Sequence, residues 1–511
     1  MIFLGSLTFT ALLYWAVSRK HIADYRVMIY LMSTAYVFSL LPSLSIPYIF
    51  DDVDHFHNLA WAQQNHQIWA WLLAPHNEHV IPLLKLLYIF CYQYFWLNPE
   101  SFHLIVLAVC LGIIALVYRL IFIFTGSELA ALAGGAIMAA SNLTDDAIFV
   151  GTNSHIFFCM FFFLLLFYAI HQYAAQREFK WKAIAFIAIL LGPSTFALGL
   201  TAVVFAPLFW RWCLSAPERE KSKDIFSWLS AGWVLSLVPY LYAMDAIIHA
   251  RHYHDVGAGT AFEAARILAP ARFLGEYVAL KLIPAVFANP YLAFGLFFLC
   301  AFTALSSTKQ LAWSRILFFA VFGLFNNFII FVFREKWGTA GLDTARYYVF
   351  PLIMIAFSYG LTLSVFFQKT TRIKQLPIAL VVYLSCFLAV ANGSAYRYHN
   401  AELLLKETMV MQSLYVNFRK AFVDYVQTHP IPGPLQVKDG DILMPSVSRL
   451  APKGGSAPAI SRYPIQTRKF YAQYVLPSSI NQKIIWSERT DPDFQKYLNE
   501  REYFFLTDGE Q

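Results

Sequence analysis

Long apolar runs separated by short polar segments dominate the hydrophobic pattern of this chain of 511 residues. Two of the runs, Ala183 to Trp210 and Ile316 to Phe333, contain no charged residue. A run of about 18 apolar residues is long enough to cross a membrane as a helix. The pattern therefore predicts an all-α polytopic membrane bundle, and counting the runs gives about twelve crossings.

The composition agrees with lipid as the solvent. Hydrophobic residues make up 59% of the chain, charged residues only 14%, and the mean hydropathy is +0.52, which is unlike a soluble protein. The net charge of +7 comes from Lys and Arg clusters that lie between apolar runs. This is the positive-inside pattern of membrane proteins, so we expect a lipid bilayer and no nucleic acid as partner.

Five basic clusters mark the segments expected on the cytoplasmic side. They are Arg19, Lys20 and Arg26; Arg177, Lys180 and Lys182; Arg211, Arg219, Lys221 and Lys223; Lys309 and Arg315; and Lys369, Arg372 and Lys374. An even number of crossings must separate neighbouring clusters. The run 183–210 satisfies this only as two short helices hinged at Gly192-Pro193.

Five apolar stretches lie between the first two clusters, so one of them should not cross. We choose 81–97, because it is short, contains Lys85 and follows a polar segment, as a juxtamembrane helix would. The alternative is that 129–142 fails to cross. Both choices keep the first loop on the outer face. The first choice places all of 48–101 there, together with the segments 143–154, 248–275 and 334–346.

The apolar start, Met1 to Val17, lacks a basic region and a small-residue cleavage site, so we expect a retained helix. The six cysteines lie in or beside apolar segments and imply neither a disulfide framework nor a CxxC metal site. We divide the chain into a transmembrane domain, 1–395, and a small extracytoplasmic α+β domain, 396–511. In the latter, Asn400 to Gln427 is helix-like and Phe470 to Leu476 is strand-like.

The first outer loop is the densest cluster of ionisable groups in the upstream part of the chain. It opens with Asp51, Asp52 and His55, and continues to His76-Asn77-Glu78-His79. Carboxylates just beyond a helix end commonly mark functional sites, although a solvated polar loop is the simpler alternative. The positions of His76, Glu78 and His79 do not have the i, i+4 spacing of a zinc-binding helix. We therefore expect substrate hydrogen bonding or helix capping from these histidines and no metal site.

Two further outer segments carry polar residues that a bundle does not need. One contains Asp145 and Asp146, and the other leads to Arg346 and Tyr347 at the mouth of a helix. The Arg346 guanidinium can grip a phosphate in a bidentate fork, or it can anchor the helix at the interface beside the tyrosines. Further positive charge in 248–275, on the outer face, runs against the positive-inside bias. An anionic ligand explains it, so we expect group transfer from a lipid-linked phosphate.

In these features the chain resembles the GT-C superfamily of membrane glycosyltransferases, which includes protein O-mannosyltransferases and the aminoarabinose transferase of lipid A. Asp51-Asp52 looks like the family's acidic pair. His76 to His79 is similar to a His-Asn-Glu-His stretch of bacterial GT-C-like proteins, and Arg346-Tyr347 to their Arg-Tyr motif. The chain departs from the pattern at Val80, where an Arg is common, and around Asp146, which lacks a clear family signature.

The resemblance implies transfer of a sugar from a polyprenyl-phosphate donor to an envelope lipid, glycan or protein, at the outer face of a bacterial cytoplasmic (inner) membrane. Asp51 is then the general base. Asp52 or Asp146 helps to bind the acceptor or a divalent cation, and Lys85 and Arg346 neutralise the leaving phosphate. His55, His76, Glu78, His79 and Tyr347 complete the substrate-binding residues.

Three other functions stay open. A transporter or flippase would need ionisable residues at membrane depth, whereas the charges here gather at one face. A zinc-dependent membrane hydrolase would use the histidines of the first loop. An accessory subunit of an envelope-polysaccharide system would use the loops for binding a partner. The sequence leaves open the sugar and the acceptor.

Overall fold

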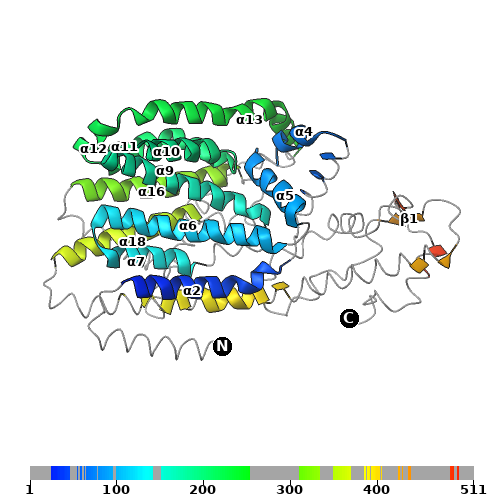
Figure 1. Cartoon of the computed structure of the whole chain (residues 1–511), viewed down its shortest axis with the longest axis horizontal. Coiled ribbons are helices and arrows are strands. Elements are labelled where there is room, and N and C mark those ends of the chain that lie inside the picture. The colour runs from blue at the N-terminus through cyan, green and yellow to red at the C-terminus, as the bar shows by residue number, and fades with distance from the viewer. Residues whose placement is uncertain are drawn as a thin grey trace.

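A computed structural model describes residues 25–46, 55, 58–59, 62–63, 65–76, 79–95, 99–141, 151–253, 310–333 and 349–369. It also describes parts of 382–405, 424–438 and 484–496. The described chain is mostly helical, and most of its helices run side by side along the long axis of the molecule (Figure 1).

The bundle consists mainly of apolar helices. These are α2 (Tyr25–Leu44), α6 (Pro99–Thr125), α7 (Glu128–Ala140), α9 (His155–Gln176), α10 (Phe179–Leu191), α11 (Ala202–Cys213), α13 (Ile225–Tyr253), α16 (Gln310–Phe333) and α18 (Val349–Lys369). Among the described residues, four helices are long and apolar enough to cross a membrane: Pro99–Thr125, His155–Gln176, Ile225–Met244 and Leu311–Ile330. They support the expected membrane location. The count of about twelve crossings stays a prediction.

The first loop contains two short helices, α4 (Ile68–Leu73) and α5 (Pro82–Phe95). With 14 residues, α5 is roughly 21 Å long, too short for a hydrocarbon core of about 30 Å. It lies obliquely at one end of the bundle (Figure 1), which favours the assignment of 81–97 as a segment that does not cross.

Helix α7 lies in the middle of the bundle, where every residue from Leu129 to Ala140 is buried. It packs between α6 and α18, and glycines allow the close approach. A Cβ at Gly134 would overlap the side chain of Ile121, and a Cβ at Gly360 of α18 would crowd the carbonyl oxygen of Ala130. Small residues at such contacts are typical of membrane helix packing. Segment 129–142 is therefore part of the bundle, and the choice between it and 81–97 as the segment that does not cross stays a prediction.

The predicted hinge at Gly192-Pro193 is confirmed. Helix α10 ends at Leu191, and a 3-10 turn, η3 (Ala197–Thr201), leads into α11. A Cβ at Gly199 would overlap the backbone of Gly192 and Pro193, so only glycine allows the chain to fold back this tightly. Two short helices thus replace one long crossing.

The described residues 393–402 are helical and run across the predicted domain boundary at 395. Farther on, β1 (Leu435–Lys438) pairs in parallel with β2 (Ile484–Ser487). Both strands lie beyond the end of the bundle at which α5 lies (Figure 1). The strand expected at 470–476 lies outside the described residues, and the α+β domain stays a prediction.

Candidate functional site at one end of the helix bundle

Polar side chains gather at the two ends of the bundle, and α9 connects them. The helix begins at His155 and is followed by its C-cap Arg177. Its 22 residues separate the two groups by roughly 33 Å. We call the group around Arg177, with Lys182, Glu218, Asp224 and Arg315, the ion-pair end. The group His55, His76, His79, Lys85 and His155 is the histidine end.

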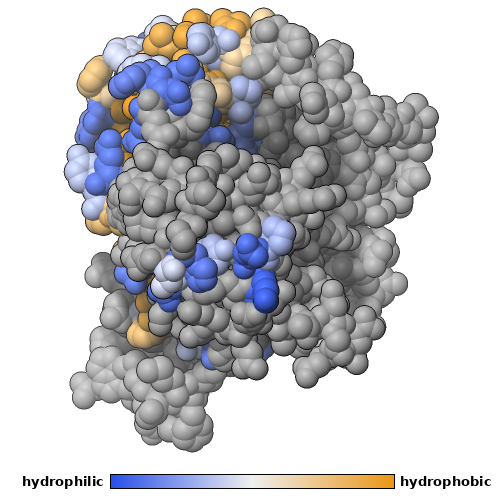
Figure 2. Space-filling view, turned by 90° about the vertical axis from the view of Figure 1, so that its right-hand side faces the viewer, coloured by the Kyte–Doolittle hydropathy of each residue, from blue (hydrophilic) through white to orange (hydrophobic). Residues whose placement is uncertain are grey.

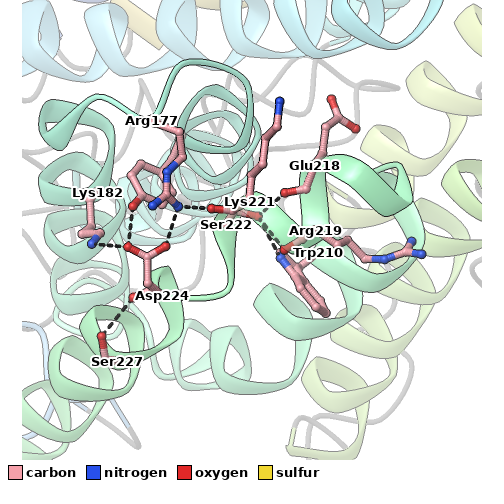
Figure 3. A network of polar contacts seen from close by, with 10 residues as sticks. Arg177, Lys182, Trp210, Glu218, Arg219, Lys221, Ser222, Asp224 and Ser227 are labelled. Atoms are coloured by element: carbon pink, nitrogen blue, oxygen red, sulfur yellow. Dashed lines mark hydrogen bonds and ion pairs between the residues drawn. The ribbon is translucent and has the colours of Figure 1, made fainter.

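At the ion-pair end, Asp224 accepts hydrogen bonds from Lys182 Nζ at 2.8 Å, Arg177 Nη1 at 2.6 Å and Tyr173 Oη at 2.6 Å (Figure 3). Burial alone would raise the pKa of this carboxyl, but the hydrogen bonds from Lys182, Tyr173 and Arg177 hold it below its ordinary value. The carboxylate is therefore fully engaged in holding α10 beside α9. All of these bonds join side chains of the protein, so we interpret the network as one that stabilises the packing of these helices.

Arg315 plays a similar part in the same group. Its Nη1 donates to Phe124 O at 2.8 Å and its Nε donates to Cys213 O at 3.1 Å, so the guanidinium caps the last turns of α6 and α11. It also lies 4.5 Å from the centroid of the Phe124 ring. Members of three predicted cytoplasmic clusters, Arg177 with Lys182, Lys221, and Arg315, thus lie at one end of the bundle. The assignment of this end to the cytoplasmic face stays a prediction.

The histidine end is built on a tight turn between α4 and α5. The backbones of His76 and His79 form an antiparallel bridge, with N–H to O distances of 2.7 and 3.0 Å. Leu83 N donates to Ser194 O at 3.2 Å, which ties the start of α5 to the hinge after α10. Figure 2 shows this end of the molecule, where hydrophilic and hydrophobic patches of the described residues lie side by side.

Ring contacts bring the histidines together from segments far apart in the sequence. The ring centroids of His55 and His76 are 4.7 Å apart, and those of His79 and His155 are 5.7 Å apart. Phe196, at the hinge, contacts His79 at 4.2 Å and His155 at 4.8 Å. The first-loop histidines thus meet the N-terminus of α9. That N-terminus adds partial positive charge to the site.

Lys85 is 2% exposed and turned toward α4. Its Nζ donates to Trp71 O at 2.6 Å and to Ala74 O at 2.7 Å, and it lies 5.1 Å from the centroid of the Trp71 ring. Carbonyls at a helix C-terminus lack intrahelical partners and attract cations. Burial lowers the pKa of Lys85 to about 7. These contacts indicate that Lys85 fixes the end of α4. They do not support the expected contact of Lys85 with a phosphate.

His55 is buried, with 4% of its surface exposed, and stacks on Tyr88 at 5.1 Å. Burial lowers its pKa well below the ordinary value, and the nearby His76, Lys85 and His155 lower it further. Its Nε2 has no hydrogen-bond partner among the residues that the structure describes. A buried, unpartnered ring nitrogen is costly, so a ligand that bonds to it would recover free energy.

The structure therefore brings together four of the predicted site residues: His55, His76, His79 and Lys85. The other predicted site residues lie outside the described part of the chain. They are Asp51, Asp52, Glu78, Asp146, Arg346 and Tyr347. In the described part, no group of three or more His, Cys, Asp or Glu side chains is arranged to hold a metal ion.

Sequence reasoning missed two residues at this end. Tyr240 of α13 donates to Pro193 O at 2.7 Å and joins α13 to the hinge. Arg397 is completely buried beside α2 and α7. The position of Arg397 next to an apolar run could have predicted a buried charge with specific partners, because charges at membrane depth are costly unless they are paired. Nothing in the sequence distinguishes Tyr240 from the other aromatic residues of α13.

No protein-family model matches the sequence, and no curated protein does. Among solved structures, the chain is similar to the crystal structure of ArnT from Cupriavidus metallidurans in the apo state. The match covers 93% of this chain and 94% of that chain, at 12% sequence identity and a TM-score of 0.48. Similarity at this level does not carry an activity or a residue role from one protein to the other.

Proposed function

We propose that the protein is a GT-C-type glycosyltransferase that moves a sugar from a polyprenyl-phosphate donor to an envelope acceptor at the outer face of the membrane. The observation that carries the proposal is the convergence of His55, His76 and His79 with the N-terminus of α9. Imidazoles and a helix N-terminus favour an anionic ligand. The sugar and the acceptor are not specified by these contacts.

The proposed residue roles follow the charges available at this end. Asp51 deprotonates the acceptor hydroxyl as general base, the acceptor oxygen forms the new bond to the anomeric carbon, and the polyprenyl phosphate leaves with the electron pair. Asp52 or Asp146 binds the acceptor or a divalent cation. Arg346 and His55 bind the phosphate, while Lys85 holds α4. His76, Glu78, His79 and Tyr347 contact the substrates.

The test is a transfer assay with purified protein, a polyprenyl-phosphate sugar and envelope extract as the source of acceptor, with released polyprenyl phosphate measured by mass spectrometry. Asp51→Asn should fold and insert as the wild type does. It should lose roughly 100- to 10,000-fold in turnover, because a hydroxyl nucleophile depends on its base. Full activity in this variant would remove the assignment of Asp51.

The zinc-hydrolase alternative has a separate test, because it depends on metal content. Four histidines at one end invite zinc, although their described geometry does not form a ligand group. We expect less than one zinc ion per chain in the purified protein. Stoichiometric zinc, lost together with activity on chelation, would favour the hydrolase.

A further inference from the structure

A buried arginine links the last described helical segment to two helices of the bundle. Arg397 is 0% exposed, and its Nη1 donates to Ser39 Oγ of α2 at 2.9 Å. Its Nη2 donates to Ala139 O at 2.9 Å and to Ser141 O at 2.6 Å, at the end of α7. The guanidinium also lies 4.5 Å from the centroid of the Tyr36 ring.

The backbone at Gly393 allows this contact. Gly393 precedes Arg397 by four residues, so both lie on the same face of the helical segment 393–402. A Cβ at Gly393 would overlap the carbonyl oxygen of Ala140. The segment therefore lies directly against the end of α7, at a distance that only glycine permits.

The chemistry of this contact specifies one geometry. The last carbonyls of a helix have no intrahelical partners and carry partial negative charge, and a guanidinium presents several donors in a rigid planar fork. A buried charge is tolerated only when its hydrogen bonds are satisfied. A small shift of α2, α7 or the segment 393–402 would break at least one of the bonds to Ser39, Ala139 and Ser141.

The helices that Arg397 joins lead into the two acidic segments of the outer face. Helix α2 ends at Leu44, and His103 Nε2 lies 2.9 Å from Ile46 O just beyond it. Asp51 and Asp52 follow a few residues later. Helix α7 ends at Ala140, and Asp146 follows in the next segment.

We propose that Arg397 is a positioning residue that fixes the starts of these two acidic segments relative to each other. The part of this proposal that concerns turnover rests on the proposed transferase function. Arg397 itself touches neither substrate nor reacting atoms in this account. It acts through the ends of α2 and α7.

Arg315 is a matched control, because it makes similar contacts at the ion-pair end. It donates to carbonyls at the ends of α6 and α11 and lies over the Phe124 ring, whereas Arg397 donates to carbonyls at the end of α7 and to a hydroxyl of α2. Replacing either arginine by lysine keeps the charge but loses the planar fork. A purely structural role predicts similar consequences for both variants.

The first experiment measures turnover and the donor KM of Arg397→Lys and Arg315→Lys in the transfer assay. Misplacement of reacting groups by about 1 Å costs on the order of 100-fold. We therefore expect kcat to fall by about 10- to 100-fold in Arg397→Lys with a donor KM within about threefold of the wild type. Arg315→Lys should keep the wild-type kcat. An equal loss in both variants, or no loss in Arg397→Lys, would overturn the positioning role.

The second experiment measures the geometry without any substrate. Spin labels at positions 38 and 396, whose native Phe38 and Tyr396 are exposed, report the distance between α2 and the segment 393–402. The described native cysteines are buried and should not react. The distance distribution should broaden in Arg397→Lys and stay narrow in Arg315→Lys. An unchanged distribution in Arg397→Lys would overturn the proposal, even if no transferase activity is found and the proposed function fails.

Discussion

The two ends of the bundle treat their charges differently, although the same helix, α9, reaches both. At the ion-pair end, Arg177 and Lys182 both bind the carboxylate of Asp224. At the histidine end, Lys85 binds two carbonyl oxygens, and within the described residues it has no carboxylate partner. The carboxylate of Asp224 thus balances part of the charge at one end, whereas the described cation of the histidine end is bound by carbonyl oxygens alone.

Two lysines make this contrast concrete. Lys182 lies 2.8 Å from Asp224, and that hydrogen bond raises its pKa. Burial lowers the pKa of Lys85 to about 7. A structural cation is stabilised in its charged form by a nearby carboxylate. Lys85, by contrast, lies beside imidazoles, and a protonated imidazole would repel the protonated ammonium group of Lys85. A strongly shifted pKa is common among the ionisable residues of functional sites.

The largest stability difference should come from replacing each lysine by methionine. Lys85→Met removes a donor from the carbonyls of Trp71 and Ala74, and Trp71 O keeps its bond from Ala74 N at 3.3 Å. With Ala74 O left without its donor, the loss should be about 1–3 kcal/mol. Lys182→Met removes an ion pair whose carboxylate is partly exposed, worth less than about 1 kcal/mol. Thermal unfolding in detergent measures both, and equal losses would contradict the comparison.

The pH dependence of stability should also differ between these variants. Between about pH 7 and pH 10.5, Lys85 is deprotonated in the folded protein but protonated in the unfolded chain. The folded protein should therefore gain stability relative to Lys85→Met as pH rises through this window. Lys182 has a raised pKa, so its contribution is fully present below pH 10.5 and is lost as pH rises further. Between about pH 7 and pH 10.5, unfolding temperatures of wild type and variant should diverge with pH only for Lys85→Met.

The smallest expected effect is that of Asp224→Asn on function. Its carboxylate is nearly half exposed, so the loss of its bonds should cost about 1 kcal/mol after allowance for solvent screening. In the wild type this contribution is present above about pH 4 and is lost as pH falls through the lowered pKa of Asp224. Turnover at neutral pH should be unchanged. A strong loss of turnover would mean that chemistry is not confined to the histidine end.

Local patterns in the sequence predicted most of the described bundle. The apolar runs located α2, α6, α9 and the α16–α18 pair, and Gly192-Pro193 marked the hinge. These features depend on neighbouring residues, because helix length and chain reversal are local properties. The expectation that 81–97 does not cross rests on the length and the charge of that one segment, and it stays a prediction.

The sequence could not assign partners to buried charges. Lys85 was expected to meet a phosphate, but its described partners are the carbonyls at the end of α4, which only the folded first loop brings near. Arg397 binds atoms 256, 258 and 358 residues away in the chain. Such contacts have no periodic signature, since they arise only after the helices pack. The roles of Asp51, Asp52, Asp146 and Arg346 stay predictions.

The central claim, that a lipid-linked anion binds at the histidine end, is tested most directly by the affinity of a polyprenyl phosphate for two histidine variants. His171 is the matched control, because it is also buried but lies 3.7 Å from Glu218 at the ion-pair end. A hydrogen bond to a charged group contributes about 1.5–3 kcal/mol. His55→Ala should therefore weaken binding by roughly 10- to 100-fold, while His171→Ala should leave the Kd unchanged. Equal affinities of wild type and His55→Ala, or a loss confined to His171→Ala, would contradict the account.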